Sequence, residues 1–96
     1  MLVLVSYDVA TSSIGGQTRL RKVSKKCLDY GQRVQNSVFE CVVDPKEFEL
    51  LKHSLLTIAD KEKDSIRFYF LGSNWKNKVE HYGAKPSVDI EGLIIL

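Results

Sequence analysis

The chain has 96 residues, of which 44% are hydrophobic and 27% charged, and its formal net charge is only +2. These values are typical of one small soluble globular domain and exclude a disordered or strongly polyanionic chain. No apolar run approaches the ~20 residues of a membrane span, and the N-terminus lacks the basic segment and cleavage site of a signal peptide. Cys27 and Cys41 form no Cys-x-x-Cys pair, which favours buried free thiols over a disulfide. We therefore expect a cytoplasmic protein with no membrane partner.

Positive charge is concentrated between residues 17 and 33. Six basic residues and one acidic residue, Asp29, give this stretch a charge of +5, which leaves −3 for the rest of the chain. A local excess of this kind is the electrostatic footprint of a nucleic-acid-binding surface, since phosphate contacts supply most non-specific affinity. A solvated helix with a lysine-rich exterior explains the charge equally well. The basic residues are Arg19, Arg21, Lys22, Lys25, Lys26 and Arg33.

The first eight residues, Met-Leu-Val-Leu-Val-Ser-Tyr-Asp, predict a buried strand that ends on a carboxylate. Asp8 lies where a polar loop begins, a position suited to holding a cation or a reacting phosphate. The flexible run 11–16 and a basic helix follow it. One carboxylate facing a cluster of cations suggests metal-assisted work on a polyanion. The alternative is an aspartate that simply caps the next loop.

The first half of the chain then predicts one helix and a β-rich segment. A helix over 17–30 carries one apolar stripe, and Gly31 is placed to be its C′ residue. Residues 33–43 are rich in β-branched side chains, with an interruption near 36–37 that predicts either a bulge or a break between two strands. The stripe consists of Leu20, Val23 and Cys27.

The second half begins with a strong helix-start signal. Asp44 is a good N-cap, Pro45 suits the first helical position, and Glu47 completes a capping box. The helix is predicted to run to about Asp60, and a strand follows over 65–71. Beyond it the sequence predicts a strand stop at Gly72, a polar extended arm over 74–86 and an apolar terminal strand over 92–96.

The element order β-α-β-β-α-β, with an extra C-terminal strand, predicts an α+β ferredoxin-like sandwich with both helices on one sheet face. One domain spans residues 1–96. The first strand is apolar on both sides, since Leu2 and Leu4 oppose Val3 and Val5, and the chain has no third helix to cover the second face. We therefore expect a homodimer, with the arm 73–96 exchanging its strand with the partner.

Several segments together resemble the small CRISPR-associated endonuclease family of spacer acquisition, the partner of the CRISPR integrase. They are Leu4-Val-Ser-Tyr-Asp8, Gly15-Gly-x-x-Arg19-Leu-Arg-Lys22, Gly31-Gln-Arg-Val-Gln-Asn-Ser-Val-Phe-Glu40, the aromatic strand and the final Leu93-Ile-Ile-Leu96. The resemblance implies a ferredoxin-like homodimer with facing sheets, which cuts RNA or double-stranded DNA. It also implies a second role, as a scaffold for the foreign DNA fragment during integration.

The same resemblance implies a site with a divalent cation, Mg²⁺ or Mn²⁺, near the dimer interface and with Asp8 as its ligand. Mg²⁺ binds through as few as one or two carboxylates, so one Asp8 from each protomer is enough for a weak site, and Arg19 or Arg33 is expected to contact the phosphate. No second acidic residue or obvious base lies near Asp8 in sequence, so slow or conditional hydrolysis is expected. The other positions that match the family site are Tyr7, Arg19, Arg33, Ser37 and Phe39.

Two further features have competing interpretations. Gly15 and Gly16 precede a helix, where backbone amides can approach a phosphate, but loop flexibility explains them equally well and no P-loop ending is present. His81 lies in the polar arm and is weakly indicated as a ligand or base.

Three functions remain: a metal-dependent nuclease, a non-catalytic DNA-binding scaffold of the integrase, and an unrelated regulator that binds a small molecule, for which no pocket signature is present.

Overall fold

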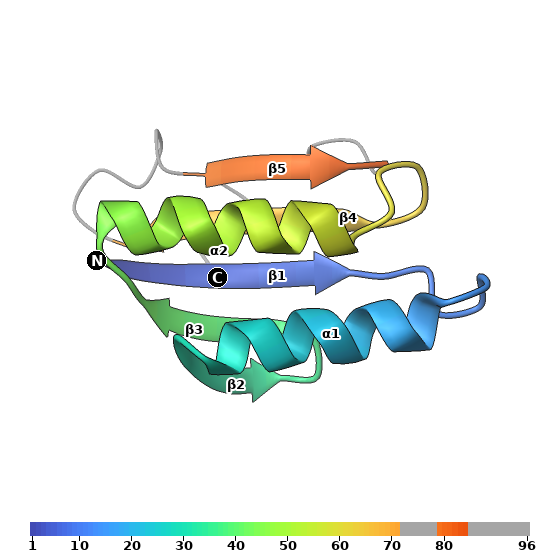
Figure 1. Ribbon diagram of the computed structural model, residues 1–96, viewed down its shortest axis with the longest axis horizontal. Helices are drawn as coiled ribbons and strands as arrows, with labels where there is room; N and C mark the ends of the chain where they lie inside the picture. The colour runs from blue at the N-terminus through green and yellow to red at the C-terminus, as the bar shows by residue number, and fades with distance from the viewer. Residues whose placement is uncertain (72–78, 85–96) are drawn as a thin grey trace.

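The computed structural model describes residues 1–71 and 79–84 (Figure 1). No helix in this part of the chain is long and apolar enough to cross a membrane. The elements, in chain order, are β1 (Leu2–Asp8), α1 (Gly16–Leu28), β2 (Gly31–Gln35), β3 (Val38–Val42), α2 (Pro45–Ile58), β4 (Ser65–Leu71) and β5 (Val79–Gly83).

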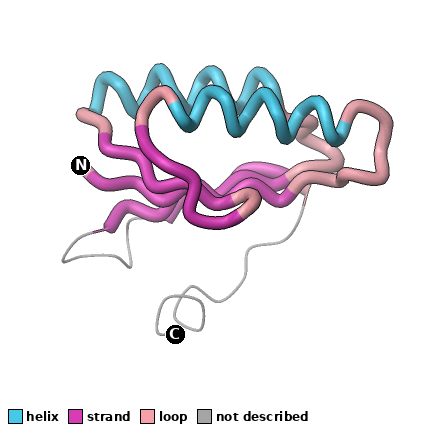
Figure 2. The backbone as a smooth tube through the Cα atoms, turned by 90° about the horizontal axis from the view of Figure 1, so that it is seen from below, coloured by secondary structure: helices cyan, strands magenta, loops and turns pink. Residues whose placement is uncertain are grey.

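The five strands form one sheet in the order β2-β3-β1-β4-β5, and every neighbouring pair is antiparallel. Both helices cover the same face of this sheet, as the side view in Figure 2 shows. The predicted α+β ferredoxin-like sandwich is therefore confirmed. β1 lies at the centre of the sheet, between β3 and β4, and its last residue, Asp8, pairs with Ser65 of β4.

The core lies between the sheet and the two helices. Alternate residues of β1, namely Val3, Val5 and Tyr7, point toward the helices and are fully buried. Each aliphatic side chain buried in this way contributes about 1.5–3 kcal/mol relative to exposure. The helices and the other strands supply the rest of the core: Val23, Cys27, Phe39, Cys41, Phe48, Leu51, Leu55, Ile66 and Phe68.

The capping box of α2 forms as predicted. The backbone N–H of Glu47 donates to Asp44 Oδ1 at 2.7 Å, and the N–H of Asp44 donates to Glu47 Oε1 at 2.9 Å. These bonds satisfy two amides that the first helical turn leaves without partners. The helix ends at Ile58, two residues before the predicted end at Asp60, because Ala59 adopts an extended conformation.

The predicted role of Gly31 is wrong. The helix α1 ends at Leu28 with Asp29 as its right-handed C-cap, and Gly31 is the first residue of β2. A Cβ at Gly31 would overlap the carbonyl oxygen of Glu40 in β3, so glycine serves the close approach of two strands and not a left-handed turn. Both interpretations of the interrupted segment hold in part: β2 and β3 are separate strands, and their register also shifts between Arg33 and Gln35.

The strand β5 was not expected from the sequence, which predicted a polar extended arm there. Residues 79–83 instead pair with β4, from Tyr69 opposite Val79 to Ser65 opposite Gly83. Lys52 of α2 supports this edge strand, with Nζ 3.5 Å from Glu80. The predicted strand stop at Gly72, the rest of the arm and the terminal strand 92–96 lie outside the described residues, so the exchange of strands with a partner stays a prediction.

The sheet face away from the helices is divided between apolar and polar halves. Leu2 of β1 is 36% exposed and lies in register between Val42 of β3, 68% exposed, and Leu71 of β4, 44% exposed. Toward the other end of β1 the same face carries Ser6, opposite Arg67 of β4. The face is therefore most apolar where β1 begins, and it carries more polar side chains where β1 ends.

Candidate functional site

Asp8 is the last residue of β1 and is exposed. It pairs in register with Ser65, the first residue of β4. Because the preceding residue, Tyr7, is buried beneath the helices, strand alternation places the Asp8 side chain on the sheet face away from them. The carboxylate predicted to bind a metal thus lies at the open end of the central strand, on the face without helices.

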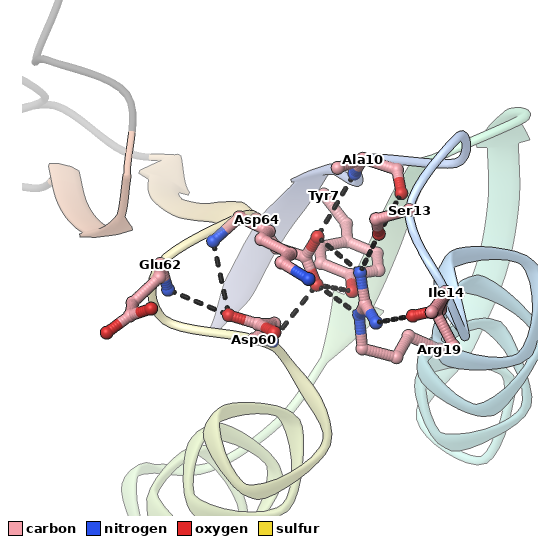
Figure 3. Close-up of polar contacts among 9 residues, drawn as sticks. Tyr7, Ala10, Ser13, Ile14, Arg19, Asp60, Glu62 and Asp64 are labelled. Atoms are coloured by element: carbon pink, nitrogen blue, oxygen red, sulfur yellow. Dashed lines mark hydrogen bonds and ion pairs between the residues drawn. The ribbon is translucent and has the colours of Figure 1, made fainter.

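Tyr7 and Arg19, two of the predicted site residues, meet at a carboxylate that the sequence analysis did not single out (Figure 3). The hydroxyl of Tyr7 donates to Asp64 Oδ2 at 2.5 Å, and Arg19 Nε donates to the same oxygen at 2.7 Å. Arg19 Nη2 reaches Oδ1 at 3.2 Å. The Asp64 side chain is fully buried and that of Arg19 is 14% exposed, so this is a mostly buried ion pair with a forked guanidinium contact.

Asp64 also accepts hydrogen bonds from two backbone amides. The N–H of Ala10, in the loop after β1, donates to Oδ1 at 3.0 Å, and the N–H of Asp60 donates to Oδ2 at 3.0 Å. The backbone carbonyl of Asp64 in turn accepts from the N–H of Ala84, just after β5, at 2.9 Å. One residue therefore connects the loop before α1, the turn after α2 and the end of β5.

These contacts favour the ionised form of Asp64. Burial alone raises the pKa of that carboxyl, but the hydrogen bonds from Arg19, Tyr7 and the two amides outweigh burial and hold the pKa well below its usual range. The pKa of the Tyr7 phenol is raised, first by burial and then by its bond to the Asp64 carboxylate. The carboxylate and the protonated phenol therefore coexist across the neutral range.

Of the three remaining predicted positions, Arg33 and Phe39 lie on the helix side of the sheet and Ser37 lies in a turn at its end. Arg33 of β2 donates from Nη2 to Ser24 Oγ of α1, and its guanidinium carbon lies 5.2 Å from the centre of the Phe39 ring. Phe39 is fully buried in the core. Ser37, in the turn between β2 and β3, accepts a hydrogen bond from the N–H of Tyr7 through its carbonyl oxygen at 2.9 Å.

The fold does not place Asp8 and the basic helix on the same side. Asp8 is on the open sheet face, whereas α1 and its cationic side chains belong to the helix layer above the other face (Figure 2). The expectation of one carboxylate facing the whole cluster is therefore not met within one chain. A shallow groove of about 480 Å³ along α1 gathers part of the cluster, and its lining is Gln17, Leu20, Arg21, Ser24, Lys25, Leu28 and Arg33.

Arg67 is a cation that the sequence analysis did not consider for the site. It lies on the same sheet face as Asp8, opposite Ser6 on β1 and opposite His81 on β5. Burial lowers the pKa of His81, and the charge of Arg67 lowers it further. Only the strand register reveals this proximity, because the sequence separates Arg67 from Asp8 by two helices and two strands.

The described residues of one chain offer few ligands for a divalent cation. Among residues 1–71 and 79–84, no three His, Cys, Asp or Glu residues are grouped as metal ligands. Asp8 supplies one exposed carboxylate, and Mg²⁺ accepts a site of one or two carboxylates completed by waters and phosphate oxygens. The donor chemistry therefore fits a weak, phosphate-dependent site, provided that a second Asp8 comes from another copy of the chain.

The glycine pair serves the loop structure. Gly15 has a φ of 80° and is the N-cap of α1, a conformation that favours glycine. A Cβ on Gly16 would overlap the carbonyl oxygen of Ala10, and the Gly16 amide donates to the carbonyl of Ser13 at 3.1 Å. Because this amide is used within the loop, the structure favours close packing as the reason for Gly16.

Together, a five-stranded antiparallel sheet under two helices and an exposed carboxylate at the end of the central strand define a ferredoxin-like protein with a candidate cation site. The family model described as CRISPR associated protein Cas2 matches residues 1–79, and the chain belongs to this family. The chain is 66% identical over 96 residues to the "CRISPR-associated endoribonuclease Cas2" of Nitratidesulfovibrio vulgaris, covering 100% of this chain and 94% of that protein.

Two further comparisons agree with this assignment. The "CRISPR-associated endonuclease Cas2" of Halalkalibacterium halodurans is 62% identical over 95 residues, covering 99% of each chain. The crystal structure of Streptococcus pyogenes Cas2 at pH 6.5 superposes with a TM-score of 0.72 at 61% identity, covering 83% of this chain and 96% of that chain. The resemblance described from the sequence is therefore confirmed.

Proposed function

We propose that this protein is a metal-dependent endonuclease that hydrolyses phosphodiester bonds of RNA or double-stranded DNA. We further propose that it acts with the CRISPR integrase in spacer acquisition for antiviral defence. Family membership and the printed names of the relatives, endoribonuclease and endonuclease, support the nuclease assignment. The structural observation that carries the proposal is the exposed carboxylate of Asp8 at the end of the central strand.

In this proposal Asp8 from each of two protomers holds one Mg²⁺ or Mn²⁺ ion. Such an ion, when bound, polarises the phosphate and lowers the pKa of a water molecule. Arg67 is assigned to the phosphate, because it is the cation that shares a sheet face with Asp8 in the register of β1 and β4. Arg19 is not assigned to it, since its guanidinium donates to Asp64, to Ser13 Oγ and to the Ile14 carbonyl.

The open sheet face supports the homodimer. Leu2, Val42 and Leu71 form an exposed apolar strip across three neighbouring strands. Contact between two such faces around a two-fold axis would cover both strips and bring the two copies of β1 to one interface. Asp8 lies on the same face at the far end of β1, so a two-fold axis that runs along β1 would also supply two carboxylates to one site.

Nucleic acid is proposed to contact the basic groove of α1 through its phosphates. Arg21, Lys25 and Arg33 line this groove, and no acidic residue is among its lining. Contacts to phosphate position a nucleic acid without reading its bases, so this surface does not choose between RNA and DNA. The substrate is left to experiment.

The test is a cleavage time course with wild type and Asp8→Asn on single-stranded RNA and on duplex DNA. Each reaction is run with Mg²⁺, with Mn²⁺ and with a chelator. Asp29→Asn is the matched control, because it makes the same chemical change at another exposed aspartate, one that pairs with Lys26 at 3.8 Å.

Metal-dependent cleavage that is lost in Asp8→Asn but kept in Asp29→Asn is the expected result. Equal cleavage by wild type and Asp8→Asn would contradict the assignment and would indicate another site or a contaminant. Absence of cleavage by wild type on both substrates under all metal conditions would contradict the nuclease proposal for the isolated protein.

A second function, a non-catalytic DNA-binding scaffold for the integrase, is favoured by one specific observation. The basic groove lies in the helix layer and Asp8 on the opposite sheet face, so binding and cleavage use separable surfaces. Salt-sensitive duplex binding that is unchanged in Asp8→Asn, together with no cleavage by wild type, would support this function.

A further inference from the structure

We propose that Asp64 is a positioning residue for Asp8, and that its carboxylate sets where the metal-binding carboxylate lies. This inference rests on the proposed function, because it concerns the same site. Asp64 itself is fully buried on the helix side of the chain, so it does not contact the substrate or the ion. It acts through the backbone on either side of Asp8.

The contacts that carry the proposal flank Asp8 in sequence. Before it, the side chain of Tyr7 is anchored by its 2.5 Å hydrogen bond to Asp64 Oδ2. After it, the backbone amide of Ala10 is anchored by its 3.0 Å bond to Asp64 Oδ1. The two oxygens of one carboxylate therefore hold the chain on both sides of Asp8, and only Val9 intervenes before Ala10.

Arg19 extends this control to the rest of the loop before α1. While its Nε and Nη2 pair with Asp64, Nη1 donates to the Ile14 carbonyl at 3.0 Å and Nη2 to Ser13 Oγ at 2.9 Å. Ser13 Oγ in turn donates to the Ala10 carbonyl at 2.6 Å. The loop thus has a closed set of hydrogen bonds that depends on the ion pair at its centre.

Strand pairing gives Asp64 a second connection to Asp8. Ser65, the residue after Asp64, is the register partner of Asp8 on β4. The carbonyl of Asp64 also receives the amide of Ala84, which fixes the end of β5 beside the same strand. A displacement of Asp64 would therefore reach Asp8 by two routes, through the loop and through the sheet.

The replacement Asp64→Asn tests this chemistry with little change in size. It removes the negative charge that faces Arg19. It also replaces one carboxylate oxygen, which accepts hydrogen bonds, by an amide NH₂, which donates them and cannot pair with the N–H and O–H donors present there. One of the anchors of the loop must then break. Tyr7→Phe is a second, milder variant, since it removes only the hydroxyl. Asp44→Asn is the matched control, because Asp44 also accepts a backbone N–H, at the start of α2.

The first readout is independent of catalysis. Amide hydrogen exchange and ¹H–¹⁵N spectra are recorded for wild type and the three variants under conditions where each is folded. We expect exchange at Ala10 to rise about tenfold or more and the Asp8 amide resonance to shift in Asp64→Asn, with a smaller shift in Tyr7→Phe. After correction for any change in the free energy of unfolding, amides within α2 should change less than about twofold in both, and Asp44→Asn should leave Ala10 and Asp8 unchanged.

The second readout is the affinity for Mn²⁺ alone, measured by calorimetry or by its electron paramagnetic resonance signal. Removal of a residue that orients a metal ligand typically lowers the metal affinity about 10–100-fold. We expect a loss of about tenfold in Asp64→Asn and no loss in Asp44→Asn. A merely structural role for Asp64 would lower the unfolding temperature without changing affinity in the folded protein.

The outcomes separate the inference from the function on which it rests. An Asp8 resonance and an Mn²⁺ affinity that stay at wild-type values in both Asp64→Asn and Tyr7→Phe would overturn the positioning role. Wild type that binds no Mn²⁺, together with a shifted Asp8 resonance in Asp64→Asn, would overturn the proposed metal site while supporting the control of Asp8 by Asp64.

Discussion

Arg19 Nε lies 2.7 Å from Asp64 Oδ2, and this contact joins residues that are 45 positions apart in the chain. Arg19 therefore stabilises the fold, whereas the sequence had suggested that it contacts the phosphate of the substrate. The guanidinium is directed inward, toward a buried carboxylate, and its other donors close the loop before α1. The consequences of this pair can be measured.

Replacement of Arg19 by Ala should destabilise the protein, because it leaves the buried Asp64 charge without its cation. Arg19→Lys should cost less, since lysine keeps the charge but loses the forked contact. Urea unfolding at neutral pH measures both. Unchanged stability together with lost cleavage would contradict this prediction and would indicate that Arg19 contacts the phosphate.

Asp64 should also make stability depend on pH in the acid range. Its pKa is held below the ordinary value of about 3.9 in the folded state, so the unfolded chain binds the proton more readily. The stabilisation is therefore fully present above about pH 4 and is lost as the pH falls from there toward the folded-state pKa. Unfolding temperatures between pH 7 and pH 2 should fall more steeply in wild type than in Asp64→Asn. Parallel curves for the two proteins would contradict this assignment.

The apolar strip on the open sheet face should control self-association. Val42→Lys places a charge within the apolar strip of the proposed interface, where burying it without a partner costs several kcal/mol. We expect the dimer dissociation constant to rise at least about tenfold, measured by light scattering over a concentration series. Leu50→Lys is the control, because Leu50 is 55% exposed on α2, in the layer away from that face. An effect of Leu50→Lys as large as that of Val42→Lys would contradict the proposed interface.

The basic groove should determine the salt dependence of nucleic-acid binding. Removal of one phosphate-contacting charge, by Lys25→Gln or Arg21→Gln, should weaken duplex binding and reduce the slope of log affinity against log salt by about 1. Lys61→Gln, which removes an exposed charge in the turn after α2, should leave the slope unchanged. Equal slopes for wild type and the groove variants would show that the phosphates lie elsewhere.

Much of the fold could be predicted because its signals are local. The continuous apolar run of β1, the capping box of α2 and the aromatic run of β4 each lie within a few residues and correspond to observed elements. The strand β5 was missed because it lies at the sheet edge, where polar residues such as Glu80 and His81 are tolerated. Residues 79–83 form a strand because they pair with β4, and their own residue pattern does not indicate one.

The amino-acid sequence by itself determined the order of the elements from β1 to β4, the family resemblance and the carboxylate at the end of the first strand, because each depends on residue types at short spacing. Only the tertiary structure decided what surrounds that carboxylate. Tyr7 and Arg19 meet Asp64 across 57 and 45 positions. Asp8 and the basic helix lie on different faces because side chains alternate along β1 while both helices cover one side. Contacts between distant segments follow from sheet register and burial, which no local pattern records.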